Sequence, residues 1–393
     1  MIEPAALTTT LSATAADELL LPPVSDVRRD DELRALEARV AAAEAAVAES
    51  RWDDAVALLE EVRVAPATCA DLALRALCAE SWARMYRGEL DTALELLRTA
   101  KELAHRPGFH DLDRADVLYR IGCVRVKRGS VARAVNDFTL ALELCERSGR
   151  PSDRLRAEIL EWRSRCYQRQ RDFDAARADV EQALELADAA GDRHLAAHAN
   201  FRASVVAERS GQWLLARFYA EKAKALYEEC GDRTNVGRLL NNLGGLNFLL
   251  GKHEQAVANL KGAVAIALDL GHDADAAYAI SSLAQVHLRA GDAAQAEPHA
   301  RHALELLGGR EDALDEIGNV QLVLGRSLLQ LGRPDEAAQW FAAAEETFER
   351  IESPSLRAAA WMAQGDLALA RGDSDSAAQL FRRAAETLQD FNF

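Results

Sequence analysis

An internal repeat of about 40 residues runs through most of this 393-residue chain and limits the folds open to it. Nine copies, spaced by 38 to 42 residues, align on one alanine each: Ala55, Ala93, Ala134, Ala176, Ala216, Ala256, Ala296, Ala337 and Ala377. A repeat of this length is one supersecondary unit that cannot bury its apolar face alone, so neighbouring copies must stack. The sequence therefore predicts a repeat array instead of two or three independent globular domains.

Positions not used for the alignment support the same frame. Seven residues after the aligned alanine, eight of the nine copies again have alanine, and twelve residues before it every copy has Ala, Ser or Gly. Five residues before it, seven copies have glycine: Gly88, Gly129, Gly211, Gly251, Gly291, Gly332 and Gly372. Small residues allow two helices to approach closely, and glycine readily adopts the left-handed conformation that ends a helix. Each copy is thus predicted to be a helical hairpin in an all-α fold.

Two copies show the pattern most fully. They are Leu243-Gly244 with Gly251, Ala256, Leu260 and Ala263, and Leu324-Gly325 with Gly332, Ala337, Phe341 and Ala344. These columns resemble the tetratricopeptide repeat (TPR) family over residues 32 to about 388, although the period is near 40 instead of 34. The longer variant is similar to the repeats of bacterial peptide-sensing regulators and of scaffold adaptors. The resemblance implies a right-handed α-solenoid of about nine hairpins whose first helices line a concave surface.

The two ends of the chain lie outside this frame. Residues 1–31 contain three consecutive threonines and Pro22-Pro23, and we expect a flexible N-terminal tail. Residues 32–388 form the nine repeats, and residues 389–393 are a C-terminal tail. The last repeat has an apolar stripe that no further helix covers: Ala377, Leu380, Phe381, Ala384 and Leu388. Either the C-terminal tail or a second copy, in a homodimer, covers this stripe.

The charge balance argues against several classes of partner. The chain has 47 Lys and Arg against 63 Asp and Glu, a formal net charge of −16. Such a surface repels phosphate backbones, so we expect no nucleic-acid partner. No stretch approaches 18 uninterrupted apolar residues, and no basic residue precedes an apolar run at the N-terminus. We therefore expect neither membrane insertion nor a signal peptide, and a cytoplasmic location.

Neither the cysteines nor any known motif in the sequence indicates a catalytic or metal-binding role. Six cysteines lack a C-x-x-C pair and are expected to be reduced, buried packing residues: Cys69, Cys78, Cys123, Cys145, Cys166 and Cys230. Phosphate-binding, serine-hydrolase and zinc-protease motifs do not occur in the sequence. His299 and His302 beside Glu297 form an incomplete metal motif, which we interpret as incidental surface histidines. We expect no enzyme and no cofactor.

The resemblance also implies which residues face the concave surface. The candidate peptide-groove residues are Arg120, Lys127, Trp162, Arg165, Arg169, His198, Phe201, Arg202, Arg209, Arg238, Asn241, Asn242, Tyr278, Gln285, Asn319 and Arg326. The same positions also include Arg75, Trp82, Asp116, Tyr119, Glu161 and Phe248. This set has nine basic residues and two acidic ones, which favours an acidic or carboxylate-bearing protein or peptide as the partner. Asn241 and Asn242 each offer a donor and an acceptor to a peptide backbone. In the alternative interpretation, these arginines are solvated or pair with acidic neighbours.

These observations predict a non-enzymatic scaffold or adaptor that binds a partner peptide segment in a basic groove. The alternative is a peptide-sensing signalling or transcription-regulating protein whose effector is a separate chain. The regulators that the chain resembles carry an N-terminal effector domain, whereas residues 1–31 are too few to form one.

Overall fold

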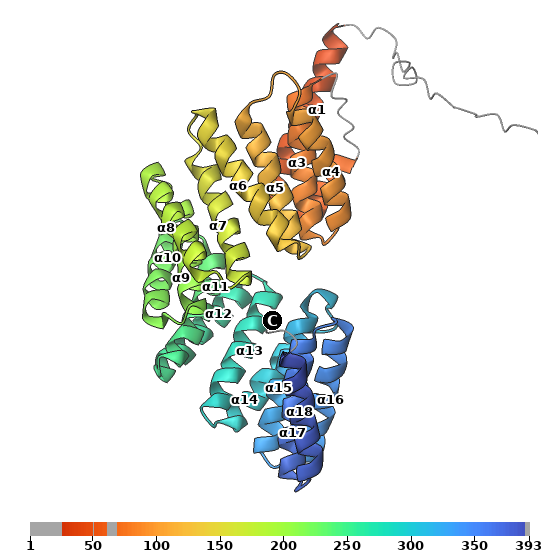
Figure 1. Cartoon of the computed structure of the whole chain (residues 1–393), viewed down its shortest axis with the longest axis vertical. Helices are drawn as coiled ribbons and strands as arrows, with labels where there is room; N and C mark the ends of the chain where they lie inside the picture. Colours follow the sequence, from red (N-terminus) through yellow and green to blue (C-terminus); the bar gives the residue numbers. More distant parts are fainter. Residues whose placement is uncertain (1–25, 50, 61–68, 390–393) are drawn as a thin grey trace, which may run out of the picture. The chain divides into compact units, whose positions relative to one another are not determined.

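The computed structural model describes residues 26–49, 51–60 and 69–389. This part of the chain contains eighteen α-helices, one short 3-10 helix and no β-strand (Figure 1). The described helices form nine successive pairs, and contacts join the two helices of each pair. The predicted all-α solenoid of helical hairpins is confirmed. No described helix is long and apolar enough to cross a membrane.

The helices belong to two compact units, residues 1–150 and 151–393. Unit 1 contains α1 (Asp26–Ala48), α2 (Trp52–Glu60), α3 (Ala70–Tyr86), α4 (Leu90–Ala104), α5 (Asp111–Lys127) and α6 (Val131–Ser148). Helix α1 begins within the segment assigned to the N-terminal tail, and the rest of that tail, residues 1–25, lies outside the described residues.

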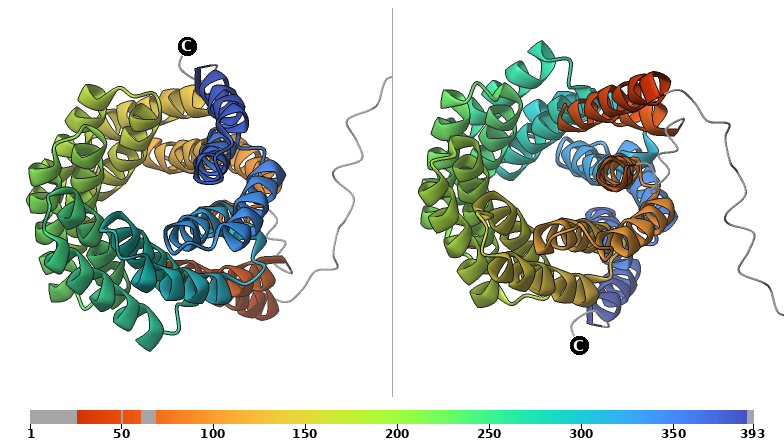
Figure 2. Two further views of the ribbon diagram at one scale, coloured as in Figure 1. Left: turned by 90° about the horizontal axis from the view of Figure 1, so that it is seen from below. Right: turned by 90° about the horizontal axis from the view of Figure 1, so that it is seen from above.

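Unit 2 contains six helix pairs, which follow one another along a curved row (Figure 2). They are α7 (Asp153–Arg169), α8 (Phe173–Ala190), α9 (Arg193–Arg209), α10 (Trp213–Glu229), α11 (Arg233–Leu249), α12 (His253–Asp269), α13 (Asp273–Arg289), α14 (Ala293–Leu307), η1 (Glu311–Ala313), α15 (Leu314–Gln330), α16 (Pro334–Arg350), α17 (Pro354–Ala370) and α18 (Ser374–Gln389).

A left-handed residue ends the first helix of the pairs, as the glycine column predicts. All seven glycines of that column have positive φ, for example +75° at Gly251. In the repeat where the column has arginine instead, Arg171 adopts the same conformation, with φ of 62°. Because a side chain rarely adopts this region, the arginine shows that the repeat imposes the turn even without glycine.

The small residues of each first helix lie against a large side chain of the second. A Cβ added to Gly122 would lie 2.5 Å from the Phe138 ring, and one added to Gly244 would lie 2.5 Å from Leu260. Phe138 and Leu260 are fully buried. The predicted close approach of the two helices is therefore confirmed, and the side chains that fill it form the core of each pair.

In unit 2, the first helices lie on the inner side of the row. Helix α7 contacts α9, and α11, α13, α15 and α17 contact one another in succession, whereas successive second helices make fewer contacts. Residues of α9, α11 and α13 line one pocket on this side. Asp192 and Asp232 fix where α9 and α11 begin, since their carboxylates accept hydrogen bonds from backbone N–H groups of the first turn.

Two predictions about burial are only partly correct. On the last helix, Ala377 and Ala384 are buried against α17 while Leu388 is 40% exposed, and residues 390–393 of the C-terminal tail lie outside the described residues. No disulfide joins cysteines of the described part. Four cysteines are buried, but Cys69 is half-buried and Cys230 is exposed, because Cys230 follows the last turn of α10.

Candidate functional site

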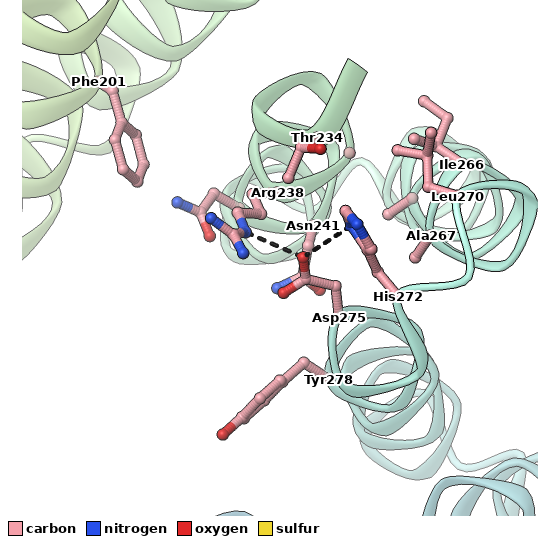
Figure 3. A pocket seen from close by; sticks show the side chains of 13 residues that line it. Phe201, Thr234, Arg238, Asn241, Ile266, Ala267, Leu270, His272, Asp275 and Tyr278 are labelled. Carbon is pink, nitrogen blue, oxygen red and sulfur yellow. Dashed lines mark hydrogen bonds and ion pairs between the residues drawn. The ribbon is translucent and has the colours of Figure 1, made fainter. Parts of the chain in front are cut away.

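A pocket of about 270 Å³ opens on the inner surface of unit 2, between α9, α11, α12 and α13 (Figure 3). It brings together five of the predicted groove residues: Phe201, Arg238, Asn241, Asn242 and Tyr278. We call it the α11–α13 pocket. Phe201 of α9 and Tyr278 of α13 approach it from different helices, and Tyr278 is 37% exposed.

One wall of the α11–α13 pocket is apolar. It is formed by Gly237, Ala263, Ile266, Ala267 and Leu270. A Cβ added to Gly237 would lie 3.1 Å from Ile266 Cγ2, so glycine allows α11 to lie close to α12. An apolar wall of this kind favours an apolar group of a ligand.

An ion pair crosses the opposite side of the pocket. Arg238 Nε donates a hydrogen bond to Asp275 Oδ2 at 3.0 Å, and His272 Nδ1 lies 3.9 Å from the same oxygen (Figure 3). The Arg238 side chain is 56% exposed, so solvent weakens this pair. Asp275 and His272 are not among the predicted residues, because both precede the first inward position of their repeat.

The two asparagines of α11 are half-buried and adjacent in the pocket. The Oδ1 atom of Asn241 is buried and has no hydrogen-bond partner among the described residues. A buried polar atom without a partner costs about 1–3 kcal/mol, so a donor from a ligand at this atom would recover free energy.

A neighbouring pocket of about 300 Å³ joins three more predicted residues: Gln285 of α13 and Asn319 and Arg326 of α15. Arg289 also lines it, with Leu288, Leu322, Val323 and Ala359. We call it the α13–α15 pocket. Its lining has two arginines and no acidic residue, so it is the more basic of the two pockets of unit 2 described so far.

Helices α7 and α9 bring together a further group of predicted residues. Arg165 lies 4.3 Å above the ring of buried Trp162, and Arg202 lies 4.9 Å from the ring of Phe201. His198 contacts Tyr227 edge-on at 5.4 Å. Arg169 and Arg209 are exposed at the ends of α7 and α9 and line none of the pockets described.

Glu161 is buried in this group, and the pKa of its carboxyl group is raised. Burial raises the pKa of Glu161 to about 7, and the charges of Arg202 and Arg165 oppose the shift only in part. Burial lowers the pKa of His198 to about 4, with His194 and Arg202 acting in the same direction. The Glu161 Oε1 atom has no hydrogen-bond partner among the described residues.

Unit 1 has its own pocket of about 410 Å³, lined by residues of α1, α3 and α5, which we call the α3–α5 pocket. Arg120 lies in it, donates a hydrogen bond to Asp116 at 2.8 Å and lies 5.2 Å from the Trp82 ring. Arg75 donates to both carboxylate oxygens of Glu44, at 2.9 and 2.6 Å. Lys127 lies outside this pocket, with Nζ 5.1 Å from the Tyr86 ring.

The α3–α5 pocket does not have the basic character that we expected of the groove. Two arginines face four acidic residues in its lining: Glu44, Asp71, Asp113 and Asp116. Asp71 and Asp113 precede the inward positions of their repeats, and Glu44, at an inward position of the first repeat, was not included in the predicted set. The pairing of arginines with acidic neighbours therefore describes this pocket.

The incomplete metal motif on α14 does not assemble. Glu297 accepts hydrogen bonds from Arg301 and Arg333, while the His299 ring stacks on His287 at 5.6 Å. No group of three or more His, Cys, Asp or Glu residues in the described part of the chain is arranged to hold a metal ion.

Known proteins share this architecture. Family models described as tetratricopeptide repeats match residues 157–189, 235–307, 281–350 and 322–390. No curated protein matches the chain in sequence.

Three solved structures show the similarity of fold. A Rap protein complexed with competence and sporulation factor is 16% identical, with a TM-score of 0.62, and the match covers 91% of this chain and 98% of that one. The apo form of the quorum sensor NprR from B. thuringiensis is 13% identical, with a TM-score of 0.62 over 92% and 100% of the two chains. Aspartyl phosphate phosphatase F from Bacillus subtilis is 13% identical, with a TM-score of 0.57 over 94% and 96%. The repeat columns, the helix pairs and these matches together show that the chain is a tetratricopeptide repeat protein.

Proposed function

We propose that this protein binds an extended peptide segment of a partner on the inner surface of unit 2, with the α11–α13 pocket as the central contact. The observation that supports this most strongly is the combination of an apolar wall with the buried, unpartnered Oδ1 of Asn241. A peptide supplies both an apolar side chain and a backbone N–H donor. The role is one of binding and includes no catalytic step.

The α13–α15 pocket extends the proposed contact in one direction. Gln285 and Tyr278 both lie on α13, so a peptide bound beside Tyr278 can continue past Gln285 toward Arg289 and Arg326. Two arginines without an acidic residue in the lining favour a carboxylate there. We therefore propose a peptide with an apolar residue followed or preceded by an acidic residue or a terminal carboxylate.

Two of the similar solved structures favour a sensing role over a purely scaffolding one. One structure is a complex with competence and sporulation factor, and another is of a quorum sensor. A peptide-responsive regulator that acts on a separate effector chain is therefore the second candidate function. In both roles the same pocket binds the peptide. A scaffold only holds the partner, whereas a regulator acts on a separate effector chain in response to the peptide.

Selection from random linear peptides displayed on phage tests the binding proposal. Immobilised wild-type protein should enrich a common sequence that contains an apolar and an acidic residue. A synthetic copy should bind in solution, measured by fluorescence anisotropy. The Asn241→Ala/Asn242→Ala variant should bind it at least about tenfold more weakly, because two hydrogen bonds of about 1 kcal/mol each are lost.

A matched control removes two amide side chains from the second helix of the same repeat. The Gln255→Ala/Asn259→Ala variant changes α12 residues that do not line the pocket, and it should bind like the wild type. Equal enrichment by wild type and the Asn241/Asn242 variant would contradict the proposal, as would equal weakening by the control variant.

A further inference from the structure

Helix α10 begins with a cluster of large apolar side chains that face solvent. Trp213 is 42% exposed, Leu214 68%, Leu215 38% and Phe218 58%. They lie on a second helix, away from the inner surface that carries the α11–α13 pocket. We call these four residues the α10 patch.

The repeat frame does not require large apolar residues at the places of Leu214, Leu215 and Phe218. At the position of Leu214, the other eight copies have Asp or Glu in six cases and Ala in two, as in Asp174 and Glu254. At the position of Phe218, the other copies have Ala, Glu, Asn, Pro or Gln. Large apolar residues at the places of Leu214 and Phe218 are therefore a feature of this helix alone, whereas Trp213 stands where other repeats have Trp52 and Phe173.

The size of the α10 patch suits the centre of a protein interface. The four side chains expose roughly 400 Å² of mostly apolar surface, since a large side chain presents about 150–250 Å² when fully exposed. A standard interface buries about 800 Å² on each partner, with an apolar centre and a polar rim.

A shallow cavity beside the patch can accept part of a partner. It measures about 30 Å³ and is lined by residues of α8, α9 and α10, among them Leu184, Leu215 and Tyr219. A hollow of this size gives a partner a shallow contact beside the patch and does not take in a whole side chain. Leu214 is the most exposed member of the patch.

Charges around the patch favour a second copy of the same chain as the partner. Arg217 lies 3.6 Å from Glu221 on α10, and Arg177 lies 3.5 Å from Asp174 on α8. A two-fold interface places each residue against residues of the same patch, so a rim with both signs can complement itself. The chain has a net charge of −16, so two copies repel each other. They can approach more easily where positive and negative charges balance locally, as around the patch.

We propose that unit 2 associates with a second copy through the α10 patch, in a two-fold contact that places α10 against α10. Leu214 and Phe218, four residues apart on one face of α10, form the apolar centre with the same residues of the other copy. This location differs from the C-terminal end, where Leu388 is the large apolar residue of α18 that is exposed among the described residues. The proposal is independent of peptide binding.

Sedimentation velocity on the full chain, from about 1 to about 100 µM, tests this proposal. The wild type should form dimers, and Leu214→Glu/Phe218→Glu should raise the dimer dissociation constant at least tenfold while the far-UV circular dichroism stays unchanged. Leu268→Glu/Leu369→Glu changes leucines of α12 and α17 that are 45% and 50% exposed, and it should leave the dimer intact. A monomeric wild type over the whole range would overturn the proposal. So would a variant at Leu214 and Phe218 that still dimerises, or equal dissociation of the control.

Discussion

The α3–α5 pocket of unit 1 and the α11–α13 pocket of unit 2 are built from the same repeat positions but offer different chemistry. Arg75 and Arg238 both lie 18 residues before the aligned alanine, and Asp113 and Asp275 both lie 21 residues before theirs. The side chains differ next to these charges. Cys78 and Ala79 occupy the places that Asn241 and Asn242 occupy in unit 2.

The arginines also pair with carboxylates from different repeats in the two pockets. Arg75 is held by Glu44 of the preceding repeat, whereas Arg238 pairs with Asp275 of the following repeat. In the α3–α5 pocket, Asp116 takes the place of Tyr278. The repeat thus fixes where a pocket forms, and a few side chains decide whether it is an acidic surface or an amide-lined site with an apolar wall.

The largest effects should follow from changes to the frame that both pockets share. Gly122→Val and Gly244→Val each introduce side-chain atoms where even a Cβ would lie 2.5 Å from a buried ring or leucine. We expect each to lower the free energy of unfolding by about 3 kcal/mol, measured by urea denaturation. Gly245→Ala, next to Gly244 with nothing within 4 Å of an added Cβ, should be neutral or stabilising. Equal stability of all three variants would show that the two helices of a pair do not approach closely at Gly122 and Gly244.

A second effect concerns Glu161, which occupies the same repeat position as Cys78 and Asn241. Burial raises its pKa from the ordinary 4.5 to about 7, so between pH 4.5 and 7 the folded state binds more protons than the unfolded state. This contribution to stability is present below pH 4.5 and is lost as the pH rises through 7. Glu161→Gln cannot titrate and should gain about 2–3 kcal/mol relative to the wild type between pH 4.5 and 7.5.

Thermal melting of both proteins across this pH range measures the difference. The titration of His198, whose pKa is about 4, affects the wild type and the variant alike and cancels in the comparison. A constant difference in melting temperature between pH 4.5 and 7.5 would show that Glu161 does not have a raised pKa.

A third prediction concerns a double substitution that gives one pocket the residues of the other at the two asparagine positions. Asn241→Cys/Asn242→Ala gives the α11–α13 pocket the residues that unit 1 has at these places. Affinity for a peptide selected on the wild type should fall about tenfold or more in isothermal titration calorimetry, because two polar groups are removed. The melting temperature should change little, since both asparagines are only half-buried. Unchanged affinity would show that the amides do not distinguish the pockets.

The smallest effect is expected at the ion pair of unit 1. The side chains of Arg75 and Glu44 are 42% and 38% exposed, and solvent weakens pairs of this kind. Arg75→Gln should cost less than about 1 kcal/mol in urea denaturation. A loss as large as that of Gly122→Val would mean that the arginine holds α1 and α3 together.

The helical frame could be predicted from the sequence because close packing restricts it strongly. Only small residues fit where Gly122 and Gly244 meet the second helix, so the columns are visible by eye. Arg171 was not predicted to take the glycine's conformation, because the turn there is imposed by the two helices it joins.

The candidate site could be predicted less well. Asn241 and Tyr278 were found from their repeat positions, whereas Asp275 and His272 come from a turn and first helical residues that precede the inward positions. The α10 patch is visible in the sequence only when each second helix is compared with the others at the position of Leu214.

Hydrogen–deuterium exchange of the wild type, with and without a peptide selected by display, tests the central claim most directly. If the α11–α13 pocket is the binding site, the peptide should slow exchange in Arg233–Leu249 and Asp273–Arg289, and leave Ala70–Tyr86 and Asp111–Lys127 of the α3–α5 pocket unchanged. Protection confined to unit 1, or protection of neither helix of unit 2, would contradict the account.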